Sequence, residues 1–471
     1  GRSGKSDLSR FPAGPVFPPV PREVPIMFDE TDVLQRGIAL AEKNDFDQAI
    51  ERFTEALRMN PKYTEAYYSR GNAYEAKGQY DNAIADYNEV LRYSAQEPAA
   101  YYNRGSAYAQ KGDRIQAIAD YDQAIRLKPD YAKAFYNRGF ALFKEGKFDR
   151  AVTDYTKAVE HDPKDADAFV ARGLVHAIRG DLDQALADYD RAIELDPNHA
   201  KAHGNRGNAF EKKGDLATAI AEYTEVIRIA PKDAKAYANR AIAFFKQDEH
   251  DKAIADYTEA IRFSPKNAKY YVSRGLAYAK KRLTDKAIAD FTEAIRLEPK
   301  LVDAYVSRGV ARAARGNREG AVDDHSKAIE LDPEHTKAYY NRAQVYGLMG
   351  QLDRALADYT RVIEISPDDA RAYCHRGVVF TRKKELDPAV ADFSKSIELD
   401  PAYSRPYYNR GLVRIIQNEP RSAVEDFTRA IELDPNYGIA YYNRGVAYQK
   451  LGQKGPSAKD FEKAKALGAS R

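Results

Sequence analysis

Tryptophan is absent from this chain of 471 residues, and cysteine occurs only once, at Cys374. A single cysteine excludes an intramolecular disulfide and any metal site built from several thiolates, and an isolated thiol fits a reducing compartment. Long hydrophobic runs are also missing, since no uninterrupted apolar stretch approaches the roughly 18 residues that a membrane-crossing helix needs. We therefore expect a soluble protein without a membrane span, with the cytoplasm as its expected location.

Neither sign of charge dominates, because 74 Lys and Arg residues stand against 71 Asp and Glu residues for a net charge of +3. So small an excess does not favour a polyanion over the whole surface, and any electrostatic preference must come from local placement. No pattern resembles a nucleophile with its base. His199 and His203 are spaced to share a helix face, but no third metal ligand accompanies them. We expect neither enzyme activity nor a cofactor or metal site.

Residues 1–29 differ in composition from the rest of the chain because six prolines are packed into them: Pro12, Pro15, Pro18, Pro19, Pro21 and Pro25. Proline fixes φ and removes backbone donors, so this leader is expected to be extended or disordered. Its proline spacing also fits a polyproline ligand, although a plain linker is the favoured interpretation.

What the rest of the sequence contains is a repeat. Numbering each unit from position 1, with repeat 1 at Glu30 and repeat 2 at Thr64, gives thirteen units of 34 residues over residues 30–471. Positions 1–14 carry apolar residues at helical spacing, position 15 is often glycine, and a second amphipathic stretch ends near a proline such as Pro129. Each repeat is thus predicted to be helix, turn, helix, a unit that can bury its apolar face only against its neighbours. Position 7 is always arginine: Arg36, Arg70, Arg104, Arg138, Arg172, Arg206, Arg240, Arg274, Arg308, Arg342, Arg376, Arg410 and Arg444.

This pattern resembles that of the tetratricopeptide repeats. Repeat 4 supplies the residues that the family places at positions 4, 8, 11, 20, 24, 27 and 32, namely Phe135, Gly139, Leu142, Ala151, Tyr155, Ala158 and Pro163. The resemblance implies an all-α fold, an alpha-alpha superhelix in the form of a right-handed solenoid of thirteen helix-turn-helix units. Some repeats depart from the pattern and predict looser packing near repeats 6, 9 and 12: His203, Arg312, Arg414, His325 and Ala95.

The arginine at position 7 replaces the family's usual leucine, and a buried cation is costly unless it is paired. An acid accompanies it, because position 23 is acidic in repeats 2 to 13, and only Arg36 has no such acid in its repeat. We predict bidentate ion pairs inside each repeat, such as Arg104 with Asp120, and interpret the arginines as architecture.

In the family that this sequence resembles, positions 2, 5, 6, 9, 12 and 13 of the first helix face the ligand, and these offsets do gather on one side of a helix. Position 6 carries a series of asparagines: Asn103, Asn137, Asn205, Asn239, Asn341, Asn409 and Asn443. A carboxamide offers a donor and an acceptor, so the series could pair with the amides of an extended peptide whatever its side chains are. It is similar to the asparagine ladder in the repeat domain of O-GlcNAc transferase. The alternative is that these asparagines hydrogen-bond within their own repeats.

Position 5 is tyrosine towards both ends of the array and small or aliphatic between them. Tyrosine suits a contact surface because it offers apolar area with a polar tip, but a packing role is an open alternative for each residue. Cys374 also stands at position 5, where we interpret it as an ordinary small groove residue. The candidate contact tyrosines are Tyr68, Tyr102, Tyr136, Tyr340, Tyr408 and Tyr442.

Position 2 is basic in several repeats although a helix N-terminus disfavours cations. Lys235 could simply pair with Asp233, and otherwise repeats 6 to 8 present a basic stretch suited to an acidic peptide or a terminal carboxylate. The basic candidates at position 2 are Lys133, Lys201, Lys235, Lys269, Lys337 and Arg371.

Together these features predict a non-enzymatic scaffold or adapter that binds extended, acidic segments of other proteins in the concave groove. Self-association through the leader or the groove is a further expectation. RNA binding by the basic groove is one alternative, and the interleaved acids Glu65, Asp167, Glu211 and Asp303 argue against nucleic acid as a partner. Another alternative is that the chain is the non-catalytic targeting arm of a larger enzyme.

Overall fold

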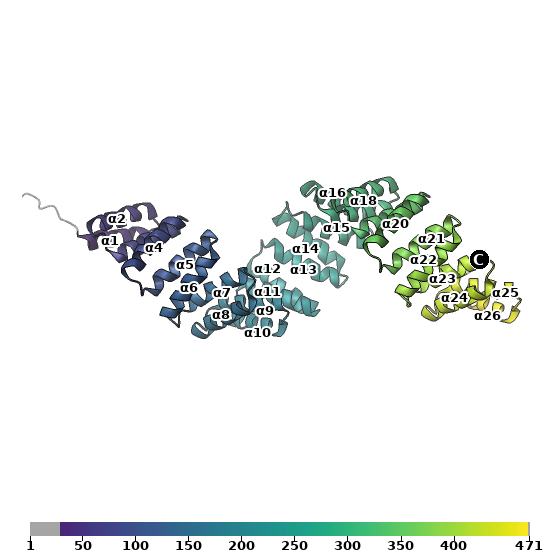
Figure 1. Ribbon diagram of the computed structural model, residues 1–471, viewed down its shortest axis with the longest axis horizontal. Helices are drawn as coiled ribbons and strands as arrows, with labels where there is room; N and C mark the ends of the chain where they lie inside the picture. Colours follow the sequence, from purple (N-terminus) through teal and green to yellow (C-terminus); the bar gives the residue numbers. More distant parts are fainter. Residues whose placement is uncertain (1–28, 470–471) are drawn as a thin grey trace, which may run out of the picture. The chain divides into compact units, whose positions relative to one another are not determined.

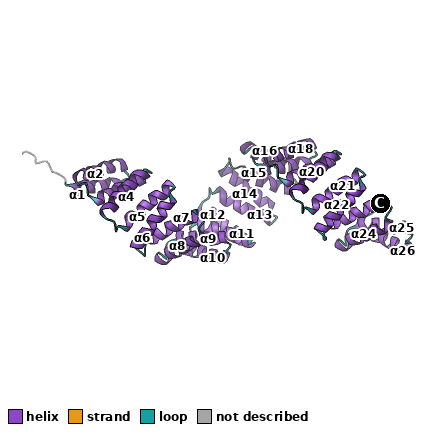
Figure 2. Ribbon diagram, viewed as in Figure 1, coloured by secondary structure: helices purple, strands orange, loops and turns teal. Residues whose placement is uncertain are grey.

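The computed structural model describes residues 29–469, and within that range the chain forms 26 α-helices and no β-strand (Figure 1, Figure 2). Each helix is 13 or 14 residues long, and consecutive helices pair into hairpins, one hairpin in each 34-residue repeat. These hairpins confirm the all-α repeat fold that the period predicts.

The chain divides into two compact units, the first ending at Pro197 and the second beginning at Asn198. The helices of the first unit are α1 (Glu30–Glu42), α2 (Phe46–Met59), α3 (Thr64–Ala76), α4 (Tyr80–Tyr93), α5 (Pro98–Lys111), α6 (Arg114–Leu127), α7 (Ala132–Lys144), α8 (Phe148–His161), α9 (Ala166–Arg179) and α10 (Leu182–Leu195). Those of the second unit are α11 (Ala200–Lys213), α12 (Leu216–Ile229), α13 (Ala234–Lys246), α14 (His250–Phe263), α15 (Ala268–Lys280), α16 (Thr284–Leu297), α17 (Val302–Ala314), α18 (Arg318–Leu331), α19 (Thr336–Leu348), α20 (Leu352–Ile365), α21 (Ala370–Arg382), α22 (Leu386–Leu399), α23 (Ser404–Ile416), α24 (Pro420–Leu433), α25 (Gly438–Lys450) and α26 (Lys454–Ala466).

The proline-rich leader expected at residues 1–29 lies outside the described residues except for Asp29. The carboxylate of Asp29 caps α1, since its Oδ1 atom accepts hydrogen bonds from the backbone N–H groups of Thr31 at 3.0 Å and Asp32 at 2.9 Å. This cap satisfies donors that the first turn of a helix cannot pair internally.

In each hairpin an aromatic ring at position 24 of the second helix packs on a small residue at position 8 of the first helix. Tyr121 in α6 is only 2% exposed, and its Cε1 atom lies 2.9 Å from the place where a Cβ atom on Gly105 would stand. Phe291 and Gly275 repeat this contact at 2.6 Å. A side chain at either glycine would push the two helices apart, because protein interiors are close-packed.

The turn inside each hairpin uses a left-handed residue at position 15. Glycine takes this conformation in most repeats, for example Gly112 with φ of 93°. Asn44 and Asp248 adopt φ of 61° at the same position. The turn therefore imposes its backbone conformation even on residues for which that conformation costs free energy.

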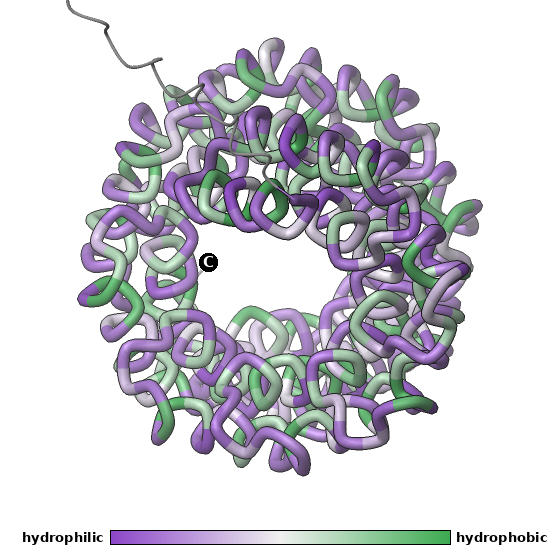
Figure 3. Tube along the Cα trace, turned by 90° about the vertical axis from the view of Figure 1, so that its left-hand side faces the viewer, coloured by the Kyte–Doolittle hydropathy of each residue, from purple (hydrophilic) through white to green (hydrophobic). Residues whose placement is uncertain are grey.

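Within each unit the first helices of neighbouring repeats contact one another, as α3 does with α5 and α15 with α17. We call positions 2, 5, 6, 9, 12 and 13 of these first helices the groove face. Figure 3 shows hydrophilic and hydrophobic residues alternating around the helical turns. None of the helices within residues 29–469 is both long and apolar enough to cross a membrane.

Candidate functional site

The arginines at position 7 form the ion pairs predicted from the sequence. Arg104 Nε donates to Asp120 Oδ2 at 2.8 Å and its Nη2 donates to Asp120 Oδ1 at 2.7 Å, and Asp120 is buried. This hydrogen bonding raises the pKa of the Arg104 guanidinium. The bidentate pairs confirm the interpretation of these arginines as architecture, because their guanidinium groups are already paired with carboxylates of the same repeat.

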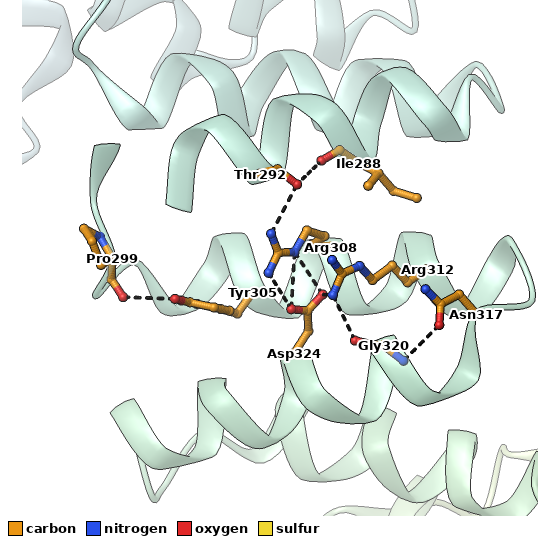
Figure 4. A network of polar contacts seen from close by, with 9 residues as sticks. All are labelled: Ile288, Thr292, Pro299, Tyr305, Arg308, Arg312, Asn317, Gly320 and Asp324. Atoms are coloured by element: carbon orange, nitrogen blue, oxygen red, sulfur yellow. Dashed lines mark hydrogen bonds and ion pairs between the residues drawn. The ribbon is translucent and has the colours of Figure 1, made fainter. Parts of the chain in front are cut away.

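A second bond of the same arginines joins neighbouring repeats, which sequence reasoning missed. The remaining nitrogen, Nη1, donates to position 25 of the preceding repeat, as from Arg274 to Thr258 at 3.1 Å. Figure 4 shows the corresponding bond from Arg308 to Thr292, at 3.2 Å. Each such arginine therefore ties its own two helices together and also holds the previous repeat.

The repeats that depart from the family pattern add polar contacts to this network. Arg312, at position 11, donates through Nη1 to Asp324 Oδ2 at 2.9 Å and to the carbonyl oxygen of Gly320 at 3.2 Å (Figure 4). Arg414 makes the same kind of ion pair with Asp426 at 3.0 Å. We expected looser packing of repeats 9 and 12 at Arg312 and Arg414. Instead, each of these arginines shares a buried carboxylate with the arginine at position 7.

The two histidines considered as metal ligands have other contacts. His199 Nδ1 accepts a hydrogen bond from the backbone of Ala202 and caps α11, whereas His203 Nδ1 lies 2.8 Å from Glu222 Oε2 in the interior. Among residues 29–469 no group of three possible metal-binding side chains occurs. Cys374 is 2% exposed, and burial raises the pKa of its thiol to about 11, so it is a packed residue of the groove wall.

Several asparagines at position 6 hydrogen-bond to the preceding repeat, and Asn443 also donates to the Ile439 carbonyl oxygen of its own repeat at 2.9 Å. Asn103 Nδ2 donates to Tyr68 Oη at 2.9 Å and to Asn72 Oδ1 at 2.9 Å. Asn137 donates to Tyr102 Oη at 3.0 Å, and Asn443 to Tyr408 Oη at 3.2 Å. In these three cases position 6 of one repeat is fixed by position 5 of the repeat before it.

The other asparagines have different neighbours because position 5 of the preceding repeat is not tyrosine. Asn239 Nδ2 donates to Asn208 Oδ1 at 3.2 Å, and Asn409 Nδ2 lies 3.7 Å from the sulfur of Cys374. Asn205 and Asn341 are half-buried and make no side-chain hydrogen bond to another described residue. Wherever a bond is made, it uses the amide nitrogen, so the carboxamide oxygens of the series have no donor among residues 29–469.

The tyrosines at position 5 are half-buried and pack on the aromatic ring at position 24 of their own repeat. The ring centroids are 6.1 Å apart for Tyr68 and Tyr87, and 5.5 Å apart for Tyr340 and Tyr359. Burial also raises the pKa of the Tyr102 hydroxyl. These tyrosines therefore contribute to packing as well as to the groove face, which was the alternative left open by the sequence.

All six basic candidates at position 2 are exposed, and none forms an ion pair with another side chain in the described part of the chain. Asp233 accepts hydrogen bonds from the backbone N–H groups of Lys235 and Ala236 and caps α13, and no ion pair joins it to the Lys235 ammonium. At position 13, by contrast, Lys246 Nζ pairs with Glu211 at 2.7 Å and Arg382 donates to the carbonyl oxygen of Gly347. The cationic side chains at position 2 are therefore available to pair with a ligand.

Exposed apolar side chains at position 9 are a further feature of the groove face. Phe140 is 47% exposed and Val310 is 49% exposed, and Leu174 and Leu276 are exposed at the same position. A hollow of about 160 Å³ beside Phe140 is also lined by Asn137 and Lys144. Position 9 is apolar in many repeats and was expected on the ligand-facing side, and the structure shows that these four side chains are exposed.

Models of the tetratricopeptide repeat match most of the sequence. One such model matches residues 34–98, 136–200 and 179–234, another 105–146 and 415–452, another 234–267 and 336–369, and another 268–301, 370–403 and 439–467. The chain belongs to the tetratricopeptide repeat family. As a tetratricopeptide repeat protein it is a protein-interaction scaffold.

No curated protein sequence matches the chain. Among solved structures, the chain is similar to yeast Tom70, at 18% identity over 87% of this chain and 100% of that one, with a TM-score of 0.43. A tetratricopeptide repeat protein from Parabacteroides merdae shares 22% identity over 53% of this chain and 98% of that one, with a TM-score of 0.44. YrrB, described as a TPR protein with an unusual peptide-binding site, shares 26% identity over 39% of this chain and 95% of that one, with a TM-score of 0.35.

Proposed function

We propose that the groove face of each unit holds extended polypeptide segments of other proteins through contacts to the peptide main chain. The observation that carries the proposal is the arrangement of the asparagines at position 6. The amide nitrogens of Asn103, Asn137, Asn239 and Asn443 bond to the preceding repeat, and the carboxamide oxygens of the series have no donor among the described residues. A carboxamide fixed in this way is an acceptor for a peptide N–H and loses little further entropy on binding.

The surroundings of the series support the same proposal. Exposed apolar residues at position 9, such as Phe140 and Leu276, offer contact area beside the asparagines. Exposed cations at position 2, such as Lys235 and Lys269, favour segments that carry acidic residues. Main-chain contacts provide affinity in this arrangement, and the apolar and basic residues provide preference.

The asparagines can be tested by replacing Asn205, Asn239 and Asn341 together with alanine. Of these side chains only Asn239 bonds to another described residue, so we expect unchanged helicity and peptide capture weakened by about tenfold or more. Binding of fluorescent decapeptides with mixed sequence, followed by polarisation, measures the effect.

A matched control replaces three exposed amide side chains on second helices, Asn82, Gln116 and Gln184, with alanine. The control should bind as the unmodified chain does. Equal binding by the unmodified chain and the asparagine variant would contradict the proposal.

A further inference from the structure

A hollow of about 440 Å³ opens on the groove face of the second unit, among the first helices of repeats 10, 11 and 12. Three of its residues occupy positions 5, 9 and 6 of these helices, namely Tyr340, Gln344 and His375. Arg371 and Arg405 both stand at position 2, of repeats 11 and 12, and Tyr403 immediately precedes α23. We call this site the arginine hollow.

The two guanidinium groups are the charged part of the arginine hollow. Arg371 and Arg405 are exposed, and neither forms an ion pair with another side chain among residues 29–469. Asp369 is the nearby acid, and its Oδ1 atom is engaged by the backbone N–H groups of Arg371 at 2.9 Å and Ala372 at 3.0 Å. Each arginine also lies in the first turn of a helix, where the helix dipole disfavours a cation, so an anion bound there would relieve two unfavourable placements.

Aromatic rings form much of the wall of the hollow. The His375 ring meets Tyr340 edge-on at 5.3 Å between centroids and stacks on Tyr359 at 5.9 Å. Burial, with the nearby Arg405 charge, lowers the pKa of His375 below its ordinary value. At neutral pH the positive charge therefore comes from the two arginines, which can each present two parallel donors to an oxyanion.

A hollow in a corresponding place of the first unit has the opposite charge. It measures about 340 Å³ and includes Tyr68 at position 5, but Glu65 stands at position 2 and Glu97 also lines the hollow. A cationic hollow is thus not a general property of these repeats. The positive charge of the arginine hollow results from the particular residues that line it in repeats 10 to 12.

We propose that the arginine hollow receives a peptide-borne oxyanion, the carboxylate of an acidic residue or the phosphate of a phosphorylated serine, from a segment held on the groove face of the second unit. The proposal rests on the proposed function, since it concerns one residue of a captured peptide. It also adds a specific acidic preference at repeats 10 to 12 to the general one that the cations of repeats 6 to 8 favour.

The test uses the full chain and four immobilised decapeptide libraries whose fixed central residue is glutamate, phosphoserine, glutamine or lysine, flanked by mixed uncharged residues. The variant R371A/R405A removes both guanidinium groups, and alanine suits position 2 because Ala99 occupies it in repeat 3. The matched control, K232A/K266A, removes two exposed cations from the turns between α12 and α13 and between α14 and α15, outside the groove face. Circular dichroism checks that all three proteins fold.

We expect R371A/R405A to lose about tenfold or more of its retention on the glutamate library, the phosphoserine library or both, while the glutamine library is unaffected. Whichever of the two libraries responds identifies the source of the oxyanion. The control should stay within about twofold of the unmodified chain on all libraries.

Unchanged retention of both acidic libraries by R371A/R405A, or an equal loss in the control, would overturn the arginine hollow while leaving peptide capture intact. If the unmodified chain retained none of the libraries, the proposed function itself would fail, and the hollow with it.

Discussion

His325 stands at position 24, where the other twelve repeats carry tyrosine or phenylalanine. It is 0% exposed, and neither ring nitrogen has a hydrogen-bond partner. Burial, helped by the nearby Arg342, lowers its pKa from 6.5 to about 4. Because the folded state resists protonation, this group's contribution to stability is fully present above pH 6.5 and is lost as the pH falls towards 4.

Replacing His325 with phenylalanine should remove this acid sensitivity, since Phe291 fills the equivalent place against Gly275. Between pH 7 and pH 5 the unmodified chain should lose roughly 2 kcal/mol more free energy of unfolding than H325F. Hydrogen exchange of α17 and α18 at the two pH values measures the difference locally. The same change with pH in both proteins would show that His325 titrates normally.

At the scale of the helix, the carboxylate at position 23 joins the two helices of a hairpin. Asp324 in α18 is buried and accepts hydrogen bonds from Arg308 and Arg312 of α17 (Figure 4). Changing it to asparagine leaves two guanidinium groups without their acid and should lower the free energy of unfolding by roughly 3–5 kcal/mol. Urea unfolding at neutral pH provides the measurement.

The adjacent Asp323 is exposed and serves as the matched control, because D323N makes the same chemical change on the solvent side. We expect D323N to change stability by less than about 0.5 kcal/mol. Similar stabilities for D324N and D323N would mean that the buried ion pairs do not hold the hairpin together.

The helices and their pairing could be predicted because each repeat carries the same local signals, namely apolar spacing, a turn residue and a compensating charge pair. Arg104 and Asp120 were predictable since both lie in one repeat. The bond from Arg104 to Asn88 was not, because it crosses to the preceding repeat. Its partner position varies between Asn88, Asp122 and Thr292, which share only the ability to accept a hydrogen bond.

The candidate site was predictable in outline for the same reason. Asn137 could be assigned to the groove face from its position, but its bond to Tyr102 depends on the neighbouring repeat and could not be read from one unit. Exposure of Phe140 likewise depends on how the first helices pack. Contacts between repeats could therefore not be predicted from the 34-residue period alone.

At the scale of the whole molecule, one hairpin architecture is repeated while its groove face varies. The arginine at position 7 and the aromatic at position 24 hold each hairpin, as Arg274 and Phe291 do in repeat 8. Positions 2, 5 and 9 differ between repeats while that frame is kept. We therefore expect main-chain recognition along the asparagines and side-chain preference at particular places such as the arginine hollow.

Main-chain recognition is tested most directly by removing the main-chain donors of the ligand. Binding of mixed-sequence decapeptides to the full chain can be compared with binding of the same peptides N-methylated at alternate residues, which keep every side chain but lose those N–H groups. If asparagine oxygens such as those of Asn103 and Asn137 accept from the peptide backbone, N-methylation should weaken binding by about tenfold or more. Equal affinity for the two sets of peptides would contradict main-chain capture.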